Sequence, residues 1–354
     1  MESVSARRAE LRAEVAGWNP AQIWQPPTRA QRWYDVSFRR LCLIFAAFTI
    51  LLIGWLVLEI AFRAVPAMRE YGIQFIYGTT WDPNKGRYGI LPEIWGTLYT
   101  SFLALVIGSA FGVAAAIFLS EGYLGEFIFK CLRALNVHFH PFWGKLPERF
   151  ELLLKNLIEL LAAVPSVVYG LWGLFVIIPL IRPACNWLHD QFGWFPLFST
   201  TLSGPGVLPA VIVLSIMILP TITAISRDAL VSVPPKLRMA AYGLGATRWE
   251  TILGVLLPTA SRGIFGGIVL GFGRALGETM ALAMLVGNAN RLTVSLFSPA
   301  NTLAALLANS FPEANAKEIP VLMYAALVLL AITLIVNIFG ALILERATAK
   351  AEAK

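Results

Sequence analysis

An arginine and a glutamate lie inside residues 263–287, a stretch of membrane length that is otherwise apolar. A charged side chain near the centre of a bilayer costs roughly 2.5–3.5 kcal/mol on insertion scales, and such residues usually face a bundle interior or a substrate path. Arg274 and Glu278 are four positions apart, so on one helix they would share a face. The stretch therefore indicates a polar site inside a membrane-spanning protein.

The order and the depth of this pair favour anion chemistry over helix reinforcement. Arginine four residues before glutamate is the less favourable order on an isolated helix. If the helix enters the membrane near Gly263, Arg274 lies about 16 Å deep, close to the midplane. A guanidinium stays charged and offers a planar fork of N–H donors that suits a tetrahedral oxyanion. The alternative is a permanent ion pair that fixes helix packing.

The composition is that of an integral membrane protein. Hydrophobic residues make up 57% of the chain and charged residues only 14%, with a mean hydropathy of +0.69, whereas soluble domains average about 25% charged residues. No segment has the alternating pattern of an outer-membrane barrel strand. We therefore expect an all-α, polytopic fold with six transmembrane helices. The expected spans are about 41–62, 97–119, 156–181, 207–226, 263–287 and 320–344.

Most lysines and arginines fall in segments that alternate spans would place on one side of the membrane. These segments are an N-terminal tail (1–40), an insertion (122–155), the loop 227–262 and a C-terminal tail (346–354). The positive-inside rule then predicts that both termini are cytoplasmic, around a permease domain at 41–345. Because this topology accounts for the net charge of +7, nucleic acid is not an expected partner.

Histidine and cysteine spacing does not predict a metal site or a disulfide framework. His138 and His140 have no third ligand nearby, and zinc sites use three or four protein ligands. We interpret them as part of an interfacial loop. Cys42, Cys131 and Cys185 fall in a span, an inner segment and an outer loop, so we expect no disulfide.

The third expected span carries a proline at its centre. Pro165 removes one backbone hydrogen bond, so we expect a kink there. The hydroxyl of Ser166 is a candidate to satisfy the freed carbonyl group. Ser166 and Tyr169 are also candidates for contact with cargo, although packing is the simpler interpretation.

The inner loop 227–262 predicts two short helices at an angle. Pro234 and Pro235 favour an extended start, because a residue that precedes proline disfavours the helical region. A helix is expected over 236–244 and a second over 246–257, with Gly245 as a left-handed cap between them. Small side chains there would let another protein approach closely. They belong to Ala240, Ala241, Gly245 and Ala246.

This loop resembles the EAA loop of ATP-binding-cassette (ABC) importer permeases, whose pattern is Glu-Ala-Ala, three residues, Gly, nine residues, then Ile-x-Leu-Pro. Residues 240–241, Gly245 and 255–258 fit the pattern. Met239 stands where the family has glutamate, so the resemblance does not extend to a salt bridge from that position. Val255 replaces isoleucine. By this resemblance, we call residues 227–262 the coupling segment.

More specifically, the chain resembles the PstC-type permeases of phosphate-specific ABC importers over about 90–121 and 156–345. The first forty residues and the segment after Glu121 fall outside the resemblance. The stretches that carry it are 118–121, 160–173, 244–250, 273–280 and 286–288.

The resemblance implies a bacterial inner-membrane subunit that imports phosphate by alternating access. Expected partners are a second permease (PstA-type), a dimeric ATP-binding subunit (PstB-type) that holds the ATP-Mg, and an extracytoplasmic phosphate-binding protein (PstS-type). That protein would dock on the outer loops 66–96, 183–206 and 288–318. We expect no cofactor on this chain and no ATPase site of its own, because it has no Gly-x-x-x-x-Gly-Lys-Ser/Thr loop.

We assign Arg274, Glu278, Thr279, Ser166 and Tyr169 to the substrate path, and the four small residues above to ATPase coupling. Glu278 has two candidate roles. It either neutralises Arg274 while the path is empty, or it pairs with a cation of the second permease.

Three other functions fit parts of the sequence. An arginine fork would also suit molybdate, tungstate or sulfate in a related ABC permease. A stand-alone anion channel or carrier would leave the coupling segment unexplained. A scaffold that senses phosphate supply and transports nothing is the third.

Overall fold

The computed structural model describes residues 28–123 and 146–352. The described residues form helices, turns and loops without a β-strand; a single bridge joins Asp82 to Arg87. The chain divides into two compact units, 1–59 and 60–354. Helix α3 (Arg29–Tyr71) supplies the described part of the first unit and continues into the second. The predicted all-α class is confirmed.

Within residues 28–123 and 146–352, six helices are long and apolar enough to cross a membrane, and each overlaps one of the expected spans. The first begins at Arg29, so the described residues 29–40, expected in a polar tail, are helical. The N-terminal part of that tail, the histidines of the insertion and Cys131 lie outside the described residues. Cys42 and Cys185 are free thiols.

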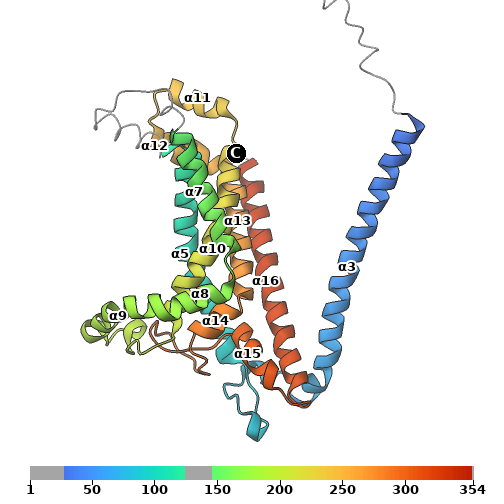
Figure 1. Ribbon diagram of the computed structural model, residues 1–354, viewed down its shortest axis with the longest axis vertical. Coiled ribbons are helices and arrows are strands. Elements are labelled where there is room, and N and C mark those ends of the chain that lie inside the picture. The colour runs from blue at the N-terminus through green and yellow to red at the C-terminus, as the bar shows by residue number, and fades with distance from the viewer. Residues whose placement is uncertain (1–27, 124–145, 353–354) are drawn as a thin grey trace, which may run out of the picture. The chain divides into compact units, whose positions relative to one another are not determined.

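Helix α10 (Val207–Val231) lies at the centre of the second unit, between α5 (Leu91–Ser120) and α13 (Leu257–Gly277) (Figure 1). Glycines allow this close packing. A methyl group added to Gly108 of α5 would lie 2.8 Å from the Ile218 side chain. One added to Gly271 of α13 would lie 2.8 Å from Ile222. At these glycines the side chains of α10 pack directly against the backbone of both neighbouring helices.

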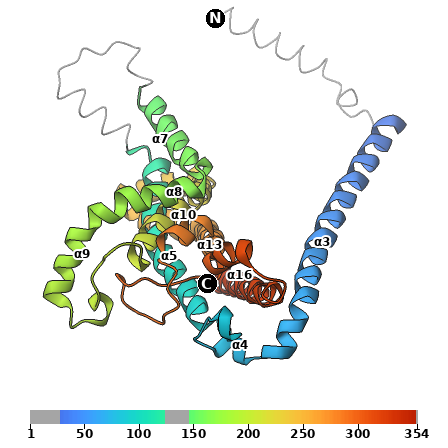
Figure 2. The same ribbon diagram turned by 60° about the horizontal axis from the view of Figure 1, so that its bottom comes forward.

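The third expected span is two helices rather than one kinked helix. Helix α7 (Leu146–Ala163) ends just before Pro165, and α8 (Ser166–Trp172) starts in a new direction. After a π-helical turn, η3 (Gly173–Ile177), α9 (Ile178–Phe192) leads away from α5 and α10 (Figures 1 and 2). The break follows from proline, whose ring clashes with the carbonyl group four residues earlier.

The coupling segment runs directly into α13. Helix α11 (Pro235–Gly243) is followed by α12 (Arg248–Thr251) and a π-helical turn, η5 (Ile252–Leu256). The predicted end of the second short helix before Pro258 is therefore wrong. Both π-turns immediately precede a helix with proline at its start. The wider turn lets a proline follow without ending the helix.

The fifth expected span also breaks. After α13 ends at Gly277, α14 (Met280–Leu285) begins a separate direction. A loop then leads to α15 (Leu303–Ser310), η6 (Phe311–Glu313) and α16 (Ile319–Glu352), which packs on α13. On the opposite side of the bundle from α11, α4 (Gln74–Tyr77) and η1 (Pro83–Lys85) form the structured turn region expected after the first span (Figure 1).

Candidate functional site

Arg274 lies in the last turn of α13 and reaches the middle of α10. Its Nη1 donates a hydrogen bond to Thr221 Oγ1 at 3.3 Å. At 1.5 Å rise per residue, Thr221 is about 20 Å from the start of α10 and about 15 Å from its end. The guanidinium therefore lies near mid-height of the most buried candidate span.

The surroundings of Arg274 favour a cation at this depth. The last turn of a helix carries partial negative charge on its unpaired carbonyl groups, which stabilises a positive side chain. Asn337 of α16 lies beside Gly273, where an added methyl group would come 3.0 Å from Oδ1 of Asn337. Polar side chains of α10 and α16 thus lie beside the last turns of α13.

Glu278 does not pair with Arg274. Helix α13 ends at Gly277, and Glu278 has extended backbone, φ −69° and ψ 126°. Among the described residues no ion pair joins the two side chains. The prediction that they share a helical face is therefore wrong, because glycine, a poor helix former, ends the helix before the turn is complete. Thr279 Oγ1 donates to the Gly277 carbonyl at 3.1 Å and helps to hold this break.

Tyr169 satisfies the backbone group that Pro165 leaves free. A residue with an N–H at position 165 would donate to the carbonyl of Leu161, four residues earlier. The Tyr169 hydroxyl donates to that carbonyl instead, at 2.7 Å. Ser166, the residue expected to do this, is half-buried at the start of α8. Tyr169 is buried and belongs to the main apolar cluster, so its contacts are structural.

Replacing Tyr169 with phenylalanine is expected to destabilise the protein by about 0.5–1.5 kcal/mol, because the Leu161 carbonyl loses its hydrogen-bond donor. The thermal midpoint of the purified protein in detergent measures this change. Tyr242→Phe on exposed α11 is the matched control and is expected to have no effect. Equal midpoints for Tyr169→Phe and the unmodified protein would contradict the structural role of the hydroxyl.

The first part of the coupling segment, as far as α12, has the shape expected from its sequence. Gly245 has φ +86°, the left-handed conformation predicted for it. Thr247 caps α12 in a capping box, in which its hydroxyl accepts from the Glu250 N–H and its own N–H donates to the Glu250 carboxylate. Ala240 and Gly245 are exposed and Ala246 is half-buried, whereas Ala241 is buried.

Large apolar side chains extend beyond this small-residue surface. Leu244 is 90% exposed, and Met239 and Trp249 are more than half exposed. Large exposed apolar side chains within one short segment are typical of a docking surface. The face formed by Met239, Leu244 and Trp249 is called the coupling face below.

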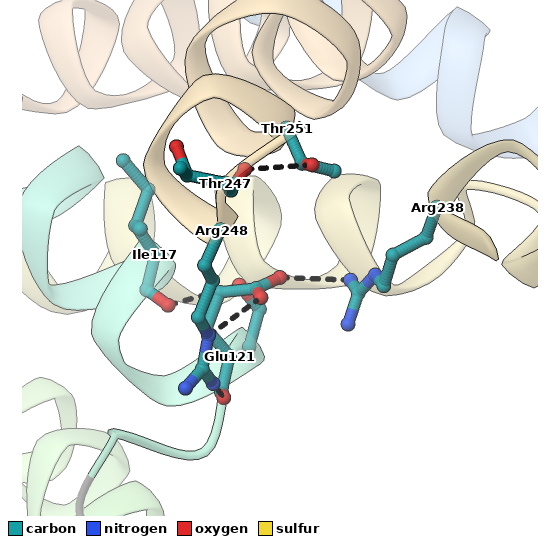
Figure 3. Close-up of polar contacts among 7 residues, drawn as sticks. Ile117, Glu121, Arg238, Thr247, Arg248 and Thr251 are labelled. Carbon is teal, nitrogen blue, oxygen red and sulfur yellow. Dashed lines mark hydrogen bonds and ion pairs between the residues drawn. The ribbon is translucent and has the colours of Figure 1, made fainter. Parts of the chain in front are cut away.

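A buried carboxylate holds the coupling segment to the end of α5 (Figure 3). Oε1 of Glu121 forms an ion pair with Nη2 of Arg238 at 2.8 Å, and Oε2 lies 3.6 Å from Nε of Arg248. Arg248 also donates to the Glu121 carbonyl and lies over the Tyr123 ring, 4.3 Å from its centroid. Only 2% of the Glu121 side chain is exposed.

Comparison with known proteins decides the family. Residues 142–348 match the binding-protein-dependent transport system inner membrane components. The phosphate transport system permease protein PstC of Pasteurella multocida is 38% identical over 88% of this chain and 92% of its own length. The protein of the same name from Haemophilus influenzae is 36% identical over 89% of this chain and 95% of its own. The chain belongs to the PstC family.

Solved structures agree at the level of the fold. The MetNI methionine ABC transporter, in an inward-facing conformation, contains a chain that superposes with a TM-score of 0.51. The identity is 18%, with 73% of this chain and 95% of that chain covered. A PstC-family chain thus shares the ABC importer permease fold with a distantly related transporter.

Two residues of these sites were not predicted from the PstC-like sequence. Thr221 is a hydroxyl in an apolar span, directly after Pro220, and that polarity was the available signal. Glu121 was noticed only as part of a family-like stretch. Its role required the position of Arg238, which is more than a hundred residues away in the chain.

A cavity of about 720 Å³ opens at the end of the bundle opposite the coupling segment. Its charged and aromatic walls come from the end of α3, the turn region and the residues just before α16. Burial raises the pKa of Tyr88, and the nearby Glu318 carboxylate adds to this effect. The cavity has a charged and aromatic lining, which includes Glu70, Tyr71, Tyr88, Lys317 and Glu318.

Proposed function

We propose that this chain is a transmembrane permease subunit of an ATP-driven phosphate importer and that Arg274 lies on the translocation path. The observation that carries the proposal is a guanidinium at mid-height of a PstC-family bundle, with Thr221 as its hydrogen-bond partner. An arginine there is costly unless a counter-charge compensates it. Phosphate would supply that charge each time an ion passes.

The chemistry of the two side chains suits phosphate. The guanidinium supplies several N–H donors in one plane, and charge-assisted contacts to phosphate oxygens are short and strong. Thr221 would exchange its hydrogen bond from Arg274 for one to the anion. Glu278 follows the helix end, so it would approach Arg274 only when the segment around Gly277 changes conformation. That change would let Glu278 neutralise Arg274 while the path is empty. Its other candidate role, a pair with a cation of the second permease, needs no such change.

Partner subunits would supply the energy for transport. A PstA-type permease would complete the path, and a PstB-type dimer, which binds ATP-Mg, would dock on the coupling face. A PstS-type phosphate-binding protein would dock at the opposite end of the bundle. Both termini would then be cytoplasmic, as the distribution of lysine and arginine predicts.

Uptake into proteoliposomes that contain the four-component importer tests this function. We expect ATP-dependent accumulation of radiolabelled phosphate, with little competition by molybdate, tungstate or sulfate. Stronger competition by one of these anions would reassign the substrate. Transport by the purified chain without the ATPase would contradict the importer mechanism.

Replacing Leu244 with aspartate is expected to abolish co-purification of the ATP-binding subunit. The substitution places a charge at the most exposed apolar residue of the coupling face, where docking would have to desolvate it. Affinity purification of the tagged chain from detergent measures the effect. Leu292→Asp, also at an exposed leucine but in the loop after α14, is the control and should retain the ATPase. Retention of the ATPase by Leu244→Asp would exclude this face as the docking surface.

A further inference from the structure

The ion-pair cluster around Glu121 is a polar link between the coupling segment and helix α5. Glu121 ends α5, and its N–H donates to the carbonyl of Ile117. Arg238 belongs to α11 and Arg248 to α12, so one carboxylate joins three helices (Figure 3). The Glu121 side chain is buried, whereas about 30% of each arginine side chain remains exposed. The buried end of the link is therefore on α5.

Other carboxylates near the coupling segment have different partners. Glu250 accepts from the Thr247 N–H at 2.7 Å and from its hydroxyl at 2.8 Å. Asp228 forms an exposed ion pair with Arg227, the residue before it. Position 239, where the EAA pattern has glutamate, holds a methionine that is 63% exposed. Glu121 is thus the carboxylate that meets α11.

Helix α11 otherwise packs on its own segment, against α12 and η5. Its ion pair to Glu121 therefore connects it to α5. Along α5, Gly108 and Gly112 contact Ile218 and Ile222 of α10 closely enough that an added methyl group would clash. The Thr223 hydroxyl of α10 also donates to the Gly112 carbonyl at 3.2 Å.

We propose that Glu121 is a positioning residue that transmits motion of the coupling segment to α5, and through α5 to Thr221 and Arg274. The inference rests on the proposed function, because the motion would come from the docked ATPase. In this chain the buried Glu121 carboxylate connects the coupling segment to α5 through ion pairs. Met239, at the position where the EAA pattern has glutamate, leaves the coupling face apolar. A tightly packed α5–α10 pair then moves as one body.

Replacing Glu121 with glutamine removes the charge and keeps the shape. The Arg238 and Arg248 guanidiniums then lose their shared counter-charge and repel each other. In the complete importer in proteoliposomes, we expect ATP hydrolysis to continue while phosphate transported per ATP falls at least tenfold. Glu159→Gln, which breaks the exposed 3.6 Å ion pair of α7 with Lys155, is the matched control and should leave the ratio unchanged.

An unchanged ratio in assembled Glu121→Gln importers would overturn the proposal. Arg238→Gln cuts the same ion pair from its exposed side and decides the question if Glu121→Gln does not assemble. The same fall in ratio supports the proposal, and the unmodified ratio refutes it. The unmodified importer separates this test from the test of the proposed function. If it transports another oxyanion, phosphate is the wrong substrate. The number of those oxyanions transported per ATP, compared between the unmodified and Glu121→Gln importers, then tests the role of Glu121.

Discussion

Replacing Arg274 with lysine is expected to lower phosphate uptake by the assembled importer roughly 10- to 100-fold. Lysine keeps the positive charge but loses the planar fork, and its ammonium group cannot bind two phosphate oxygens side by side. A hydrogen bond to a charged group contributes roughly 1.5–3 kcal/mol, and about 1.4 kcal/mol corresponds to a tenfold change. The initial rate of radiolabelled phosphate uptake measures the effect, after co-purification of the ATPase has confirmed assembly.

The control for this variant is Arg227→Lys. Arg227 forms an exposed ion pair with Asp228 near the end of α10, so the same substitution there should change uptake little. If Arg274→Lys transported phosphate at the unmodified rate, Arg274 would have no place on the path. Its hydrogen bond to Thr221 would then be a contact that fixes the packing of α13 on α10.

The all-α membrane class of the fold could be predicted because it follows from the overall composition and from the length of the apolar stretches, not from any particular contact. Stretches of about twenty apolar residues are long enough to cross a bilayer as helices, and each expected span overlaps one of the six long apolar helices among the described residues, although two of the spans are interrupted. The left-handed conformation of Gly245 was predictable for a similar reason, since glycine adopts it without steric cost. Such local preferences do not depend on which helices later become neighbours.

The breaks within the expected spans and the hydrogen-bond and ion-pair partners of the arginines depend on tertiary contacts. They could therefore not be predicted in full from the sequence. Pro165 indicated a bend, but a complete break between α7 and α8 is stabilised by Tyr169, which satisfies the freed carbonyl of Leu161. The spacing of Arg274 and Glu278 implied a shared face only if the helix continued beyond Gly277. The partners that Arg274 and Arg238 actually have, Thr221 and Glu121, lie on other helices.

The effect of alanine at Gly96 follows from one such tertiary contact, and we expect it to be the largest loss of stability among these variants. The added methyl group would lie 1.9 Å from the Asn301 carbonyl oxygen, which is backbone and has no side-chain rotation to relieve the clash. The loop around Asn301 is also held to α5 on both sides of this contact. Trp95 Nε1 donates to the Thr293 carbonyl at 2.9 Å, and the Leu303 N–H donates to Thr97 Oγ1 at 2.9 Å.

Because these bonds hold the loop, Gly96→Ala must either break them or shift α5. We expect a loss of about 3 kcal/mol, at the upper end of typical overpacking, and a lower thermal midpoint in detergent. Gly266→Ala on α13 is the matched control, since open space surrounds that glycine. Alanine there should be neutral or stabilise the helix by about 0.5–1 kcal/mol. Equal midpoints for the two variants would mean that the loop around Asn301 moves to admit the methyl group, and the close approach of Gly96 to Asn301 would then contribute little to stability.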